Sequence, residues 1–112
     1  MVFQLVPDLG WAHAYLVKSS PAPQEVLIRP PTMVQLWFNE RLEPPYSHVS
    51  VFDAEGRRVD LDDEHVDRLD SKKLVIGIHG LVPGSYRVKY RVLSVDGHIV
   101  ESEYTFTVRG RR

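Results

Sequence analysis

Cysteine is absent from this chain of 112 residues. Its absence excludes disulfide scaffolds, thiolate zinc sites, iron–sulfur clusters and cysteine nucleophiles. Only two methionines are present, so the chain lacks the thioether cluster that would suit a soft monovalent metal. The side chains that remain as borderline metal ligands are those of five histidines: His13, His48, His65, His79 and His98.

A charge excess and long apolar runs are missing too. The 14 Lys and Arg residues stand against 15 Asp and Glu, a formal net charge of −1, which argues against a nucleic-acid-binding surface. No stretch holds the roughly 18 apolar residues of a membrane-spanning helix. The motifs of serine hydrolases, phosphate-binding loops and zinc proteases are also absent, so we expect a binding protein and not an enzyme.

The first twelve residues, MVFQLVPDLGWA, differ from the rest of the chain. Gly10 and Ala12 occupy the −3 and −1 positions of a possible signal-peptidase cut before His13. The segment lacks the basic start and the apolar stretch of about 7–15 residues that a full leader has. We interpret residues 1–12 as an N-terminal tail or signal-peptide remnant, residues 13–108 as one domain, and residues 109–112 as a basic C-terminal tail.

Beyond His13 the hydrophobic pattern has a period of two. Apolar and polar residues alternate over residues 86–92 and 103–109, and over residues 33–39 Val34, Leu36 and Phe38 alternate with the opposite face; this is typical of strands with one buried face. Ala54-Glu55-Gly56 is typical of a hairpin turn, whereas the acidic stretch 60–70 is expected to be a loop or a single helical turn. Half-buried strands need a second sheet to cover them. The pattern predicts an all-β fold, a Greek-key β-sandwich or small barrel.

The segment Ser94-Val95-Asp96-Gly97-His98 carries the most specific chemistry. Residues i and i+2 of an extended chain point to one side, so Asp96 and His98 can present an oxygen and a nitrogen to one point. A metal would need a further ligand, and His13 is the candidate. Nitrogen and oxygen donors without sulfur favour copper(II). A cut before His13 would add its α-amine, although an Asp-Gly turn also explains the segment without any metal.

A second, weaker candidate is the acidic surrounding of His65. Its neighbours Asp62, Asp63, Glu64 and Asp67 could hold a hard cation or a second copper ion. A charge run of this kind is more often a solvated loop.

Several separate motifs follow one another along the chain: His13-Ala14-Tyr15-Leu16, Ser20-Pro21-Ala22, Leu36-Trp37-Phe38-Asn39-Glu40, Leu42-Glu43, Leu81-Val82-Pro83-Gly84-Ser85-Tyr86-Arg87-Val88 and Ser94-Val95-Asp96-Gly97-His98. In this order they resemble the motifs of the CopC family of periplasmic copper-binding proteins. The resemblance spans residues 13–108. It departs from the family pattern at Ile99, where proline is frequent, at Ser102, where glycine is, and in the twelve residues before His13.

The resemblance implies an immunoglobulin-like or cupredoxin-like Greek-key fold of about seven strands. It implies one Cu(II) per chain, bound by the amine and imidazole of His13 together with Asp96 and His98. Family members with a second, monovalent site carry a methionine-rich loop, which this chain lacks. The implied protein lies at the periplasmic or extracellular side of the membrane and serves copper resistance or homeostasis beside a membrane copper-transport partner of the CopD type. Nothing in the sequence pattern demands more than a monomer, so we expect a monomer.

Two other functions remain open from the sequence. A copper-chelating N-terminal His resembles the histidine brace of copper oxygenases, which would make the protein an enzyme. Alternatively, the chain is an immunoglobulin-like interaction module without a metal. The latter predicts no copper-dependent shift in melting temperature, because a ligand of the native state must stabilise the fold.

Overall fold

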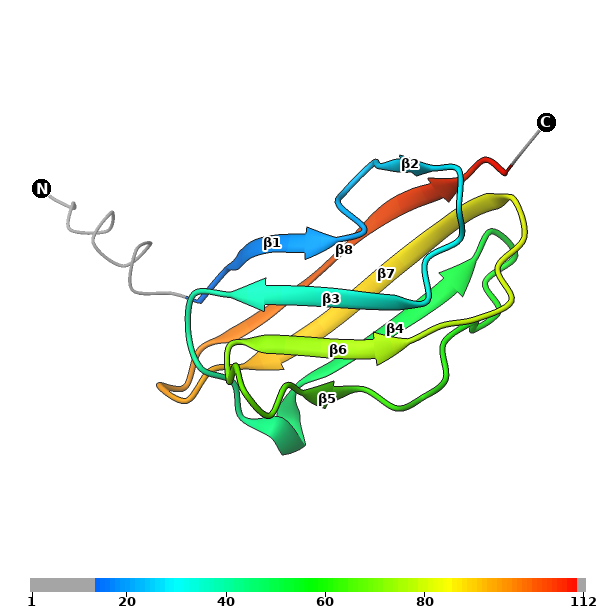
Figure 1. Cartoon of the computed structure of the whole chain (residues 1–112). Helices are drawn as coiled ribbons and strands as arrows, with labels where there is room; N and C mark the ends of the chain where they lie inside the picture. The colour runs from blue at the N-terminus through cyan, green and yellow to red at the C-terminus, as the bar shows by residue number, and fades with distance from the viewer. Residues whose placement is uncertain (1–13, 111–112) are drawn as a thin grey trace, which may run out of the picture.

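A computed structural model describes residues 14–110 as two four-stranded sheets packed face to face (Figure 1). One sheet has the order β1-β3-β6-β5 and the other β2-β8-β7-β4. Neighbouring strands are antiparallel except for the parallel pair of β2 and β8. The strands are β1 (Leu16–Ser20), β2 (Val26–Leu27), β3 (Met33–Phe38), β4 (His48–Asp53), β5 (His65–Val66), β6 (Lys73–Gly77), β7 (Gly84–Leu93) and β8 (Ile99–Val108).

The predicted Greek-key β-sandwich is therefore confirmed. The strands number eight in the described part of the chain, where about seven were expected, because β2 and β5 each add a two-residue edge to a sheet. Two residues are too few to show an alternating pattern. A 3-10 turn, η2 (Pro44–Tyr46), precedes β4.

The core lies between the sheets and follows the alternation in the sequence. In β7, Tyr86, Val88, Tyr90 and Val92 are buried, and the three basic residues between them are exposed. Leu36 and Phe38 of β3 and Phe106 of β8 complete the packing, with Phe38 edge-on to Tyr90 at 5.6 Å and Tyr86 stacked on Phe106 at 5.4 Å. Each fully buried apolar side chain contributes about 1.5–3 kcal/mol, so this core holds both sheets in register.

The acidic stretch 60–70 contains no helical turn; it is a loop interrupted by β5. Two of its carboxylates replace missing strand partners. The Asp60 side chain, 1% exposed, accepts hydrogen bonds from Val51 N at 2.7 Å and from the Arg58 guanidinium at 2.8 Å. Asp63 Oδ1 accepts from Gly77 N at 2.8 Å. These aspartates have a structural role, because they satisfy backbone donors that the loop leaves unpaired.

The beginning of β1 and the turn between β7 and β8 lie at the same end of the sandwich (Figure 1). The segment after β3 joins them. Asn39 pairs with Tyr15 in both directions: its side-chain Oδ1 accepts from Tyr15 N at 2.6 Å, and its N donates to Tyr15 O at 3.1 Å. Two residues later, Arg41 O accepts from Val95 N at 2.9 Å. One short segment thus supports both the start of the described chain and the β7–β8 turn.

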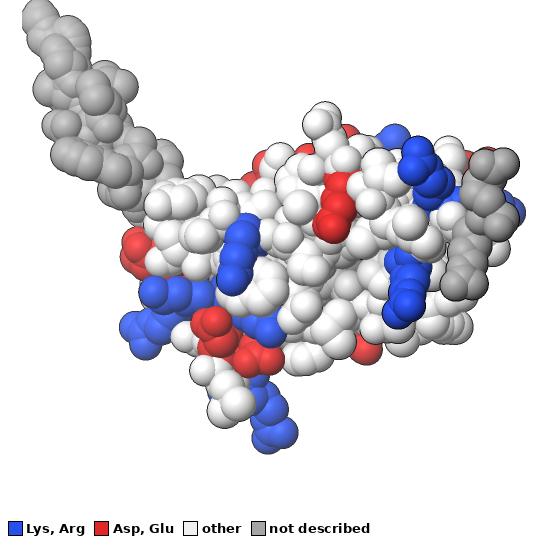
Figure 2. All heavy atoms as spheres, turned by 45° about the horizontal axis from the view of Figure 1, so that its top comes forward, with Lys and Arg blue, Asp and Glu red and all other residues white. Residues whose placement is uncertain are grey.

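The surface carries both charge signs. Figure 2 shows basic and acidic side chains interspersed over the face it presents, with uncharged atoms between them. Among residues 14–110, no helix has the length and apolar character needed to cross a membrane.

Candidate metal centre

Residues 94–98 form a tight turn because β7 and β8 stay paired up to Leu93 and Ile99. Backbone bonds close the turn: Ser94 N donates to His98 O at 2.9 Å, and Gly97 N donates to Ser94 O at 2.9 Å. Gly97 has φ +93°, in the left-handed region that favours glycine. The glycine therefore lets the residues on either side of it turn toward each other.

Asp96 and His98 meet across this turn. Asp96 Oδ1 lies 3.1 Å from His98 Nδ1, and the two side chains are 44% and 34% exposed. Bonds of about 2.0–2.2 Å, the lengths that zinc makes to His nitrogen and carboxylate oxygen, put two adjacent ligand atoms about 3 Å apart. The pair thus has the spacing of two neighbouring ligands of one ion and is open to solvent.

Ser94 underlies this pair. It is 1% exposed, and its Oγ donates a hydrogen bond to Asp96 Oδ1 while accepting one from His98 N at 3.1 Å. The Ser94 hydroxyl has the largest effect on the pKa of Asp96 and holds it below its usual value; burial, the next largest effect, opposes it, and His98 adds a further lowering. The carboxylate, which is the form that binds a cation, therefore persists to lower pH than in an isolated aspartate.

The third predicted ligand, His13, lies outside the described residues. The described chain starts at the next residue, Ala14, which is 5% exposed. Tyr15 follows, and its N donates a hydrogen bond to Asn39 Oδ1. Within residues 14–110, no group of three or more His, Asp or Glu side chains is placed to hold a metal ion. The described part of the chain therefore contains two of the three predicted ligands, Asp96 and His98.

The sequence model of the CopC domain family matches residues 16–109 of this chain. The chain belongs to the CopC family. The resemblance seen in the ordered sequence motifs is thereby confirmed, and the match covers every strand of both sheets.

Solved CopC-family structures share this fold. The crystal structure of CopC from Methylosinus trichosporium OB3b is 38% identical, with a TM-score of 0.82 over 89% of this chain and 97% of that one. PcoC, a methionine-rich copper resistance protein from Escherichia coli, is 29% identical, with a TM-score of 0.75 over 87% of this chain and 99% of that one. The copper transport protein CutJ of Bacillus subtilis is 31% identical over 92% of this chain, which spans only 19% of CutJ.

The other candidate histidines of this CopC domain do not assemble a second centre in the described residues. His65 Nδ1 lies 3.0 Å from the backbone oxygen of Asp63, and no third ligand joins it. His48 Nδ1 lies 3.1 Å from Glu64 Oε2, an ion pair when the imidazole is protonated. The acidic residues around His65 instead bind other parts of the protein: Asp63 accepts from Gly77 N, Glu64 contacts His48, and Asp67 accepts from Leu69 N.

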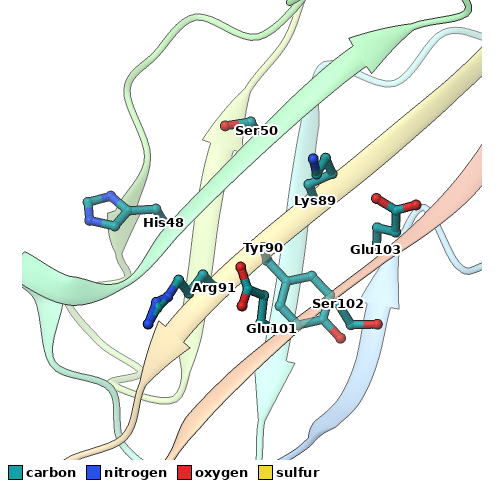
Figure 3. A pocket seen from close by; sticks show the side chains of 8 residues that line it. All are labelled: His48, Ser50, Lys89, Tyr90, Arg91, Glu101, Ser102 and Glu103. Carbon is teal, nitrogen blue, oxygen red and sulfur yellow. The ribbon is translucent and has the colours of Figure 1, made fainter. Parts of the chain in front are cut away.

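A depression of about 400 Å³ lies on the outer face of β4, β7 and β8 of the CopC domain (Figure 3). Its lining has mixed charge, with Lys89 and Arg91 from β7 facing Glu101 and Glu103 from β8, and His48 at its edge. Sequence reasoning missed it. The outward positions of these strands were visible as the polar members of the alternation, but their gathering around one hollow depends on the pairing of β7 with β4 and β8.

Proposed function

We propose that this CopC-family protein is an extracytoplasmic copper(II)-binding protein that serves copper resistance or homeostasis. It carries or buffers one Cu(II) per chain through His13, Asp96 and His98. The observation that carries the proposal is the Asp96–His98 pair, 3.1 Å apart, at the end of the sandwich where the described chain begins. The copper-related names of CutJ and PcoC support copper as the metal.

The donor chemistry favours the divalent ion. Two imidazoles and a carboxylate are nitrogen and oxygen ligands that suit tetragonal Cu(II), which also heads the affinity order of the divalent first-row metals. His13 directly precedes Ala14, so the Cα atoms of the two residues are about 3.8 Å apart. If the chain is cut before His13, the new α-amine and the imidazole form a chelate. Its affinity falls in acid, because both groups must lose their protons to bind.

Exchange of the ion fits the exposure of the site. The Asp96 and His98 side chains are each at least one third exposed, so a receiving protein can reach an ion held between them. We propose a membrane copper-transport protein of the CopD type as that partner. The chain acts as a monomer and is not an enzyme. It lacks a methionine-rich site for monovalent copper, because its sequence holds only two methionines.

Competition titration of Cu(II) against a calibrated chelator tests the proposal. A chain that begins at His13 should bind one equivalent, and His13→Ala, Asp96→Ala and His98→Ala should each weaken binding by more than about tenfold. His65→Ala is the matched control, because this exposed histidine lies in β5 and its Nδ1 contacts the backbone oxygen of Asp63. Absence of binding would leave the immunoglobulin-like interaction module, and copper-dependent oxidation of a substrate would favour the oxygenase.

A further inference from the structure

One buried hydroxyl connects the two ligand residues of the β7–β8 turn. Ser94 is 1% exposed, yet its Oγ reaches both of them: it donates to the Asp96 carboxylate and accepts from the backbone N of His98. Its own backbone is fixed independently, by the bond from Ser94 N to His98 O and by the bridge to Leu42. The hydroxyl therefore has a defined position from which to orient the Asp96 side chain.

We infer that Ser94 is a positioning residue of the metal centre, which sets the orientation of the Asp96 carboxylate before the metal arrives. This inference rests on the proposed function. The hydroxyl acts on Asp96 Oδ1, the oxygen that lies 3.1 Å from His98 Nδ1. Ser94 thus acts through Asp96 and does not itself need to touch the ion.

The physical reason is the freedom of an exposed aspartate. The Asp96 side chain is 44% exposed, and an exposed aspartate without a fixed partner samples the three staggered positions about χ1; the position it adopts here places Oδ1 3.1 Å from His98 Nδ1. The hydrogen bond to a charged acceptor selects that position in the free protein. Metal binding then loses little further conformational entropy at the Asp96 side chain, so the affinity for the metal is higher.

Ser47 provides a matched control in the same region. It is 2% exposed, and its Oγ also makes two hydrogen bonds, donating to Glu43 O at 2.9 Å and accepting from Leu93 N at 3.3 Å. Neither bond reaches Asp96 or His98. Ser47→Ala and Ser94→Ala therefore remove comparable buried hydrogen bonds from neighbouring places, and only Ser94→Ala removes one from a ligand side chain.

The experiment measures Cu(II) affinity and the electron paramagnetic resonance spectrum of the copper-loaded chain that begins at His13. Ser94→Ala should weaken binding about 10- to 100-fold, the loss usual for a residue that orients a ligand, and should change the copper hyperfine pattern. Ser47→Ala should match the wild type in both. Equal affinity and equal spectra for Ser94→Ala and wild type would overturn the inference.

A pair of similar volume guards against misfolding of the alanine variant. Ser94→Thr keeps the hydroxyl, and Ser94→Val replaces that hydroxyl with a methyl group, so the threonine and valine side chains have nearly the same shape. We expect threonine to bind Cu(II) more tightly than valine by about tenfold or more, and equal affinities would again overturn the role of the hydroxyl. Failure of the wild-type chain to bind Cu(II) would instead refute the proposed function, so the two failures are distinguishable.

Discussion

Asn39→Ala tests whether the start of the chain takes part in the metal centre. The Asn39 side chain accepts a hydrogen bond from Tyr15 N at 2.6 Å, and this bond ties the residue two positions after His13 to the segment that also supports the β7–β8 turn. Alanine removes that bond. The backbone bond from Asn39 N to Tyr15 O, 3.1 Å long, is retained, so the segment is loosened but stays paired.

The expected magnitude is worked from the bond between Tyr15 N and Asn39 Oδ1. A net hydrogen bond contributes about 0.5–1.5 kcal/mol, and about 1.4 kcal/mol changes an equilibrium tenfold. If His13 is a ligand, binding must restore the order that alanine removes, and Cu(II) affinity falls about 2- to 10-fold. Chelator competition measures this change in a chain that begins at His13. Asn39→Asp retains an acceptor for Tyr15 N and should keep at least wild-type affinity.

A particular pattern of results would refute the reasoning about Asn39. If Asn39→Ala binds Cu(II) as tightly as wild type while His98→Ala does not, the start of the chain contributes nothing to the site. The metal would then be held by side chains of the described residues and other donors, without His13.

Three further predictions concern stability. Cu(II) at about 100 times its dissociation constant should stabilise the fold by about 2.7 kcal/mol, which raises the melting temperature by about 10 °C. His98→Ala should abolish this shift, and a shift that persists in the variant would contradict the role of His98 in the site. Asp60→Ala should lower the free energy of unfolding in urea by about 1–3 kcal/mol, because Val51 N loses its acceptor, whereas the 45%-exposed Arg58 can turn to water; an unchanged midpoint would contradict this role. The pKa of Asp53 lies below its ordinary 3.8 because the backbone N–H of Arg57, followed by that of Glu55, favours the carboxylate, so its contribution to stability is present above pH 3.8 and lost as the pH falls below it. Asp53→Asn should accordingly be less stable than wild type at neutral pH and equal to it in strong acid, as denaturation at both pH values would show.

The long strands could be predicted from the sequence because each has its own alternating pattern. Tyr86, Val88, Tyr90 and Val92 are buried as the period of two requires. The approach of Asp96 and His98 was likewise predictable, since it depends on residues two apart around one glycine. The strand pattern follows from the geometry of the strand itself, whereas Asp96 and His98 approach each other through the turn at Gly97 and not through the extended chain that the sequence argument assumed.

Features that depend on distant partners could not be predicted. Asp63 bonds to Gly77, 14 residues away, and Asn39 to Tyr15, 24 residues away, and neither spacing has a sequence signature. The strands β2 and β5 exist only because β8 and β6 offer them an edge. The role of Ser94 also escaped the sequence reading, because its burial depends on packing and not on the motif around it.

Copper binding at His13, Asp96 and His98 is tested most directly by comparing the chain that begins at Met1 with one that begins at His13, each in competition with a calibrated chelator. We expect one Cu(II) per chain, bound more tightly when His13 has a free amine. Absence of Cu(II) binding by both chains would show that this protein does not carry copper at these residues.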